Sequence, residues 1–125
     1  MDSTDQRPDA PVKRRVLVVE DELMIRMLLE DMLDDLGYAV AGVAGRIDEA
    51  VALAQSADFD IAILDVNLNG QAVSPVVEVL NARGLPYIFA TGYGEKGVPE
   101  AHRGRPTLQK PFQQDALGRA LSGIN

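Results

Sequence analysis

Hydrophobic residues along this chain follow two alternating patterns, short continuous runs and longer segments with helical spacing. The continuous runs, such as Ile61–Leu64, are typical of strands in a parallel sheet that is covered on both faces. Between residues 25 and 36, apolar residues instead recur at intervals of three and four and form one face of a helix. The expected strands cover residues 15–19, 38–43, 61–64, 86–91 and 106–109, and the expected helices residues 25–36, 46–56, 75–83 and 113–122.

This alternation of strands and helices with short connections predicts one α/β domain with a doubly wound parallel sheet. A flavodoxin-like (βα)5 fold with strand order 2-1-3-4-5 is the commonest arrangement at this size. Residues 92–105 hold four glycines and few apolar side chains, so we expect the fourth helix to be short or mobile. Residues 1–14 are polar, and we expect a flexible tail there ahead of a folded domain at 15–125. Ser74, which precedes a proline, is expected to cap the third helix.

Charged and polar side chains stand where the expected strands end. Glu20 and Asp21 follow the first strand and Asp65 the third, while Thr91 ends the fourth and Lys110 follows the fifth. In the predicted order the first and third strands are neighbours at the point where the order reverses, which is where open α/β sheets bind ligands. We therefore expect these side chains to converge at one edge of the sheet.

Three carboxylates in one cleft need a compensating cation. Two like charges about 4 Å apart repel by roughly 4 kcal/mol at an effective dielectric near 20, and Lys110 supplies one positive charge. Mg²⁺ favours oxygen ligands and commonly takes one or two carboxylates together with phosphate oxygens. The sequence therefore predicts a magnesium site at Glu20, Asp21 and Asp65. A carboxylate beside such an ion, a lysine and a hydroxyl is suited to accept a phosphoryl group, with Asp65 as the nucleophile.

Each of these residues also has a simpler interpretation. Asp65 can merely end a strand before a turn, and Thr91 can be an ordinary strand-end threonine. Lys110 can belong to a simple turn. Glu20 and Asp21 can complement the dipole of the helix that follows them. That last interpretation is compatible with a magnesium site, but it does not explain an aspartate of another strand in the same cleft.

Taken in order, these motifs resemble those of a response-regulator receiver domain, and the resemblance covers residues 15–122. The motifs are Glu20-Asp21, Leu64-Asp65-Val66-Asn67-Leu68, Thr91 and Lys110-Pro111. The resemblance implies a phosphorelay in which a histidine kinase or a histidine phosphotransfer protein phosphorylates Asp65, and a downstream signalling protein responds. The implied Mg²⁺ ligands are Glu20, Asp21, Asp65 and the main-chain carbonyl of Asn67. Thr91 and Lys110 would contact the phosphoryl oxygens. Such a protein receives a phosphoryl group and is not a classical enzyme.

Two features depart from the ordinary receiver pattern. Thr107 stands three residues before the lysine, where ordinary receivers carry Tyr or Phe. The stretch Phe89–Gly94 resembles the signature of an atypical stand-alone subgroup known by its Phe-Ala-Thr-Gly (FAT GUY) opening, often linked to histidine kinases of alphaproteobacterial stress signalling. We therefore expect Tyr93 and the segment 92–105 to replace the usual aromatic switch, with Thr91 as the other switch residue, although a half-exposed loop aromatic fits Tyr93 equally well. Since the last expected helix uses nearly all of the remaining chain, we expect a stand-alone receiver.

Composition narrows the partners and the compartment. The 125 residues carry a net charge of −7, and their basic run is the short Lys13-Arg14-Arg15, so we expect no nucleic-acid binding. No apolar run reaches the length of a membrane span, and the absence of cysteine fits the reducing cytoplasm. His102 is the single histidine and is expected to be a solvated loop residue.

Two functions of other classes stand as alternatives. A metal-dependent phosphatase with an aspartyl nucleophile would need an acid two residues after Asp65, where this chain has Asn67. A flavodoxin-like electron carrier would need a phosphate-binding loop after the first strand, where Glu20-Asp21-Glu22 would repel phosphate. These residues disfavour both alternatives, and the colour of the purified protein would distinguish the flavin carrier.

Overall fold

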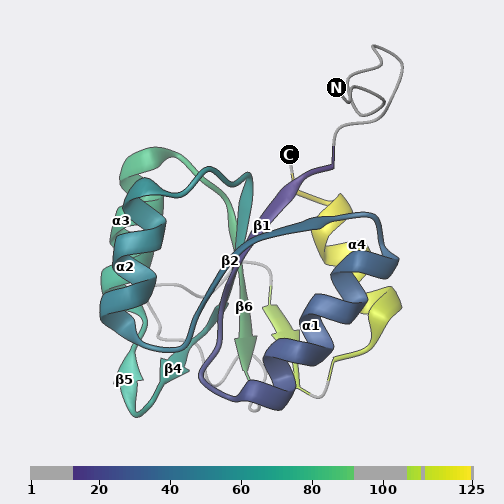
Figure 1. The fold of residues 1–125 in the computed structure, drawn as a ribbon, viewed down its shortest axis with the longest axis horizontal. Helices are drawn as coiled ribbons and strands as arrows, with labels where there is room; N and C mark the ends of the chain where they lie inside the picture. The colour runs from purple at the N-terminus through teal and green to yellow at the C-terminus, as the bar shows by residue number, and fades with distance from the viewer. Residues whose placement is uncertain (1–12, 92–106, 111, 125) are drawn as a thin grey trace, which may run out of the picture.

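Five parallel strands form one sheet between two layers of helices in the computed structural model, which describes residues 13–91, 107–110 and 112–124 (Figure 1). The strands pair in the order β2-β1-β3-β6-β7, which is the predicted flavodoxin-like order 2-1-3-4-5. They are β1 (Arg15–Val19), β2 (Ala39–Ala44), β3 (Ile61–Asp65), β6 (Tyr87–Thr91) and β7 (Thr107–Gln109). The helices of the described residues are α1 (Leu23–Asp35), α2 (Ile47–Ser56), α3 (Ser74–Arg83) and α4 (Gln114–Ser122).

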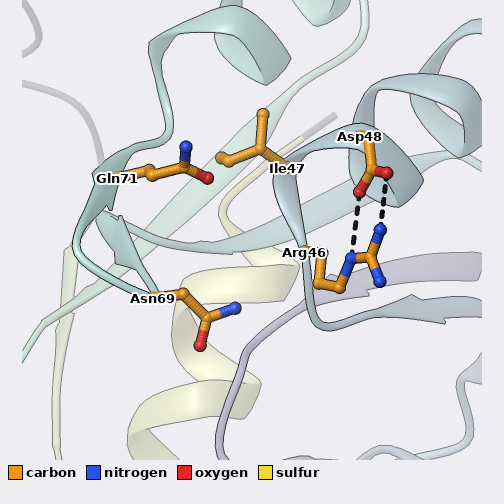
Figure 2. Close-up of a pocket in the computed structure, with 5 residues that line it drawn as sticks. All are labelled: Arg46, Ile47, Asp48, Asn69 and Gln71. Atoms are coloured by element: carbon orange, nitrogen blue, oxygen red, sulfur yellow. Dashed lines mark hydrogen bonds and ion pairs between the residues drawn. The ribbon is translucent and has the colours of Figure 1, made fainter.

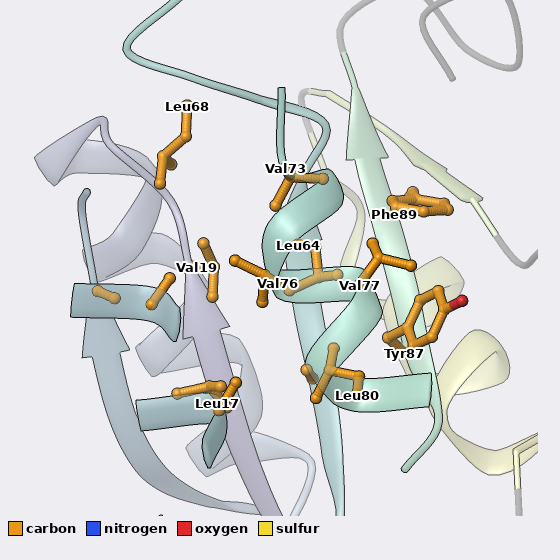
Figure 3. Close-up of a cluster of buried hydrophobic side chains, with 14 of the residues drawn as sticks. Leu17, Val19, Leu64, Leu68, Val73, Val76, Val77, Leu80, Tyr87 and Phe89 are labelled. Carbon is orange, nitrogen blue, oxygen red and sulfur yellow. The ribbon is translucent and has the colours of Figure 1, made fainter. Parts of the chain in front are cut away.

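Both faces of the central strands β1, β3 and β6 are buried, which explains why these strands are largely apolar. Leu17 and Val19 of β1 pack into a core cluster with residues of α2 and α3, and Figure 3 shows this cluster around α3. Val16 and Val18 belong to a second cluster, with residues of α1 and α4. Successive side chains of a strand point to opposite faces, so one strand supplies both cores. Figure 1 shows α2 and α3 on one side of the sheet and α1 and α4 on the other.

The helices follow their predicted apolar stripes, with one correction at a helix start. Leu29 and Leu33 of α1 are fully buried, and Gly84 ends α3 in the left-handed conformation at φ 70°. Ser74 does not cap α3: it is the first helical residue, and the cap position belongs to Val73. The side chain of Val73 is buried in the core, so the cap lies one residue earlier than expected and the helix begins at Ser74.

A small hairpin that is not among the expected strands follows Asp65. It consists of β4 (Asn67–Leu68) and β5 (Gln71–Ala72), which pair antiparallel. Asn69 and Gly70 join the two strands with φ angles of 53° and 81°, the signs that a type I′ turn requires at both central positions. Figure 1 places this hairpin at the end of the sheet toward which the arrow of β6 points.

Several predictions fall on residues that the structure does not describe. They concern the tail up to residue 12, the fourth helix, Tyr93, His102 and Pro111. Arg14, at the end of the expected tail, donates a hydrogen bond from its guanidinium to the Ile124 carbonyl at 2.8 Å. Within the described ranges, no helix has the length and apolarity that crossing a membrane requires.

Candidate functional site

The register of the parallel strands brings the predicted site residues to one edge of the sheet. Val19 pairs with Leu64, so Glu20 and Asp65 stand at neighbouring strand ends. On the other side of β3, β6 ends in Thr91, whose carbonyl accepts a hydrogen bond from the Lys110 N–H at 2.9 Å. Thr91 itself is buried, with 2% of its surface exposed.

Three carboxylates form the centre of this edge. One oxygen each of Glu20, Asp21 and Asp65 can be chosen so that all lie within 4.8 Å of one another. Glu20 and Asp65 are buried, with 1% and 6% exposed, and Asp21 is partly exposed. The convergence expected from the strand order is therefore present in the fold. We call these three residues the acidic cluster.

Lys110 is the cation nearest to the acidic cluster among the described residues. Its Nζ lies 2.8 Å from Glu20 Oε1, 3.2 Å from Asp65 Oδ2 and 3.8 Å from Glu22 Oε1. The contact with Asp65 is a hydrogen bond, whereas the contact with Glu20 Oε1 has ion-pair distance without hydrogen-bond geometry. One ammonium group thus lies within 4 Å of three acidic residues, and Asp21 is a further acid of the cluster, so the acids outnumber the cation.

Burial and local donors set the ionisation of the acidic cluster. Burial raises the pKa of Glu20 to about 7, and burial also raises the pKa of Asp65 above its ordinary value. Burial acts in the same direction on Asp21, but hydrogen bonds, led by the Asn69 N–H, outweigh it and lower the pKa of Asp21. Burial by itself would lower the pKa of Lys110, yet the carboxylates of Glu20 and Asp65 outweigh it and raise that pKa. Lys110 therefore stays charged, while burial works against the ionisation of Glu20 and Asp65.

The β4–β5 hairpin holds two members of the acidic cluster by its main chain. The Asn67 N–H donates to Asp65 Oδ1 at 3.2 Å, and the Asn69 N–H donates to Asp21 Oδ2 at 2.9 Å. The Asn67 side chain serves the turn, because its Oδ1 accepts from the Gly70 N–H at 3.0 Å. Sequence reasoning did not single out Asn69. The available signal was the dipeptide Asn69-Gly70, which is typical of a two-residue hairpin turn.

The residues of the acidic cluster fit a hard divalent cation. Glu20 Oε1 is buried and accepts no hydrogen bond from the described part of the chain, so it has unused acceptor capacity beside two further carboxylates. The Lys110 ammonium at 2.8 Å supplies charge to this oxygen but no hydrogen bond, and an oxygen-only donor set is the kind that Mg²⁺ prefers. The Asn67 N–H contacts the Asp65 carboxylate. A role for the Asn67 carbonyl as a metal ligand stays a prediction.

An open surface pocket of about 470 Å³ lies beside the hairpin turn (Figure 2). It is lined by Arg46, Ile47, Asp48, Asn69 and Gln71. Two hydrogen bonds of 2.7 and 3.2 Å join the guanidinium of Arg46 to the Asp48 carboxylate at its rim, and both side chains are largely exposed. No member of the acidic cluster lines this pocket, which meets the cluster through Asn69.

A family model described as the response regulator receiver domain matches residues 16–122. The chain belongs to this family. Receiver domains are the response-regulator modules of two-component systems. SdrG from Sphingomonas melonis Fr1, known from a solution structure, is 41% identical in sequence, with a TM-score of 0.81 over 90% of this chain and 97% of that chain. The BeF3-activated conformation of SdrG from Pseudomonas melonis Fr1 is 44% identical, with a TM-score of 0.75 over 86% and 92% of the two chains.

Curated relatives of this receiver include longer regulators. The transcriptional regulatory protein PdtaR of Mycobacterium tuberculosis is 37% identical over 117 residues, which is 90% of this chain and 57% of PdtaR. The phyllosphere-induced regulator PhyR of Methylorubrum extorquens is 30% identical over 127 residues, which is 98% of this chain and 47% of PhyR. The chain thus spans about half the length of these relatives.

Proposed function

We propose that this receiver accepts a phosphoryl group on Asp65 in a Mg²⁺-dependent reaction. The donor is a phosphohistidine of a histidine kinase or a histidine phosphotransfer protein. The observation that carries this proposal is the convergence of Asp65 with two further carboxylates and Lys110 at one edge of the sheet. Membership of the receiver family supports it.

In the proposed reaction a carboxylate oxygen of Asp65 attacks phosphorus. A P–O bond forms, the P–N bond to the donor imidazole breaks, and the electron pair of that bond returns to the ring nitrogen. The product is an acyl phosphate. The Asn67 N–H and the Lys110 ammonium each contact one oxygen of Asp65, and so they orient the carboxylate before the reaction.

The other site residues have distinct proposed roles. Glu20, Asp21 and Asp65, together with the Asn67 carbonyl, would hold Mg²⁺, which when bound offsets the negative charge of the phosphoryl oxygens and of the carboxylates. Lys110 stays charged beside Asp65 and contacts the incoming phosphoryl oxygens. Thr91, buried at the end of β6, donates its hydroxyl hydrogen to the phosphoryl group.

Phosphorylation changes the binding of a downstream signalling protein in this proposal. A phosphoryl group adds about −1.5 to −2 charges near neutral pH, on the surface edge formed by the strand ends. The stretch that opens with Phe89 supports a place in the Phe-Ala-Thr-Gly subgroup, with Thr91 and Tyr93 as the switch. Tyr93 lies outside the described residues. If Tyr93→Ala left the phosphorylation-dependent NMR shifts of residues 92–105 intact, the switch proposal would fail.

Intact-mass measurement tests the phosphoacceptor. The chain is incubated with Mg²⁺ and acetyl phosphate, and we expect it to gain the mass of one phosphoryl group. Asp65→Asn should abolish the gain, because the amide lacks a nucleophilic oxygen anion. Asp58→Asn is the matched control, since Asp58 is exposed and precedes β3 at the opposite edge of the sheet. A wild-type chain that gains no mass, or a full gain by Asp65→Asn, contradicts the proposal.

A further inference from the structure

The β4–β5 hairpin connects the acidic cluster to the end of a third strand. Its two N–H groups at Asn67 and Asn69 each hold a carboxylate of the cluster. The side-chain amide of Asn69 extends the connection, because its Nδ2 donates a hydrogen bond to the Gly45 carbonyl at 2.9 Å. Gly45 directly follows β2, so one asparagine joins the ends of β1, β2 and β3.

Asn69 is suited to this position by its backbone as well as its amide. Its φ angle of 53° lies in the left-handed region, which asparagine adopts more readily than most side chains do. Figure 2 shows Asn69 on the hairpin facing the segment that carries Arg46 and Ile47. In this conformation the N–H of the residue reaches Asp21 while its amide reaches Gly45. One residue thus makes both contacts, and neither of them involves Asp65.

We propose that Asn69 is a positioning residue of the cation site, acting through Asp21. Its side chain anchors the hairpin to the segment after β2, and the anchored hairpin keeps the Asn69 N–H on Asp21 Oδ2. A carboxylate that is already fixed by a second partner loses less freedom when it takes up a cation, so the anchor raises cation affinity. This inference rests on the proposed function, because it concerns the same site.

Mg²⁺ titration of the full chain by isothermal calorimetry tests the proposal. Asn69→Gly keeps the main-chain N–H and the positive φ angle but removes the amide that contacts Gly45. We expect it to weaken Mg²⁺ binding by roughly 10-fold, the scale found for groups that orient metal ligands. Gln71→Ala is the matched control: it removes another exposed amide of the same hairpin, and we expect its Kd to stay within about twofold of the wild type.

A second variant and a stability measurement separate positioning from mere structural support. Asn69→Asp keeps the side-chain size but turns the donor into an acceptor facing the Gly45 carbonyl. If this contact matters, its Mg²⁺ affinity should fall even though it adds a negative charge near the site. Thermal unfolding without Mg²⁺ reports the structural effect of each variant. A lower Tm with wild-type Mg²⁺ affinity in both Asn69 variants overturns the proposal.

The outcome is distinguishable from a failure of the proposed function. Wild-type Mg²⁺ affinity in Asn69→Gly, together with normal phosphorylation of Asp65, overturns the positioning role and leaves the phosphoacceptor intact. Weakened Mg²⁺ binding in Asn69→Gly, together with no phosphorylation of the wild type, supports the positioning role and contradicts the proposal that Asp65 is the phosphoacceptor. Absence of Mg²⁺ binding by the wild type overturns the positioning role as well.

Discussion

Replacing Glu20 with glutamine should change how the stability of the metal-free protein depends on pH. Burial raises the pKa of Glu20 from 4.5 to about 7 in the folded state. The folded state therefore binds more protons than the unfolded chain between these two values, and the free energy of unfolding falls as the pH rises through this window. At 1.36 kcal/mol per pKa unit, the loss between pH 5 and pH 8 is about 2 to 3 kcal/mol.

Glu20→Gln removes this ionisation. Between pH 5 and pH 8, the free energy of unfolding of the variant should therefore rise by about 2 to 3 kcal/mol relative to that of the wild type. This holds whatever the stability of the variant at pH 5. The difference between variant and wild type cancels the titration of groups that do not interact with Glu20. Urea unfolding in EDTA, followed by far-ultraviolet circular dichroism at the two pH values, measures it.

Glu22→Gln is the control variant, because it removes an acidic group near Lys110 that is not buried. Glu22 is also near Lys110, at 3.8 Å, but its side chain is 66% exposed. An exposed ion pair contributes about 0 to 1 kcal/mol, so its variant should show a small pH-dependent difference. An equal stability difference between wild type and Glu20→Gln at pH 5 and pH 8 would refute the reasoning, because burial would then not suppress ionisation.

Three further variants test the site and the fold. Lys110→Ala should slow phosphorylation of Asp65 by roughly 100-fold, because it removes the ammonium group beside the nucleophile, and an unchanged rate of mass gain would argue against a role in transfer. Leu64→Ala should lower the free energy of unfolding in urea by about 2 to 5 kcal/mol, because Leu64 is fully buried in the core; a loss under 1 kcal/mol would contradict that packing. Gly84→Ala should cost about 1 kcal/mol in the same assay, because its φ angle is 70° with open space around it, and a stabilised variant would contradict the backbone assignment.

The sheet and the acidic cluster could be predicted because both depend on short-range signals in the sequence. The apolar run of Ile61–Leu64 identified a buried strand, and Asp65 at its end was therefore placed at the edge of the sheet. Strand order then followed from the usual topology of alternating strands and helices, so Glu20 and Asp65 became neighbours. The 2.8 Å contact between Lys110 and Glu20 depends on side-chain conformation, which a hydrophobic pattern does not report.

The hairpin after Asp65 was missed for a physical reason. Its strands have two residues each, which is too short for an alternation of polar and apolar side chains to be visible. The Asn69-Gly70 dipeptide indicated the turn, but without flanking periodicity it resembled an ordinary loop. The predicted start of α3 was wrong for a related reason. The cap position depends on the burial of Val73, and burial is a property of the folded molecule.

The separation of the site residues along the chain has a consequence for biosynthesis. Asp65 and Lys110 lie 45 positions apart, and Lys110 directly follows β7, the last strand of the sheet in sequence order. While the polypeptide emerges from the ribosome, all three acids are therefore translated well before the ammonium group that neutralises part of their charge. The strand ends of the nascent chain therefore carry uncompensated negative charge until β7 docks, so the site is complete only after Lys110 has left the ribosome.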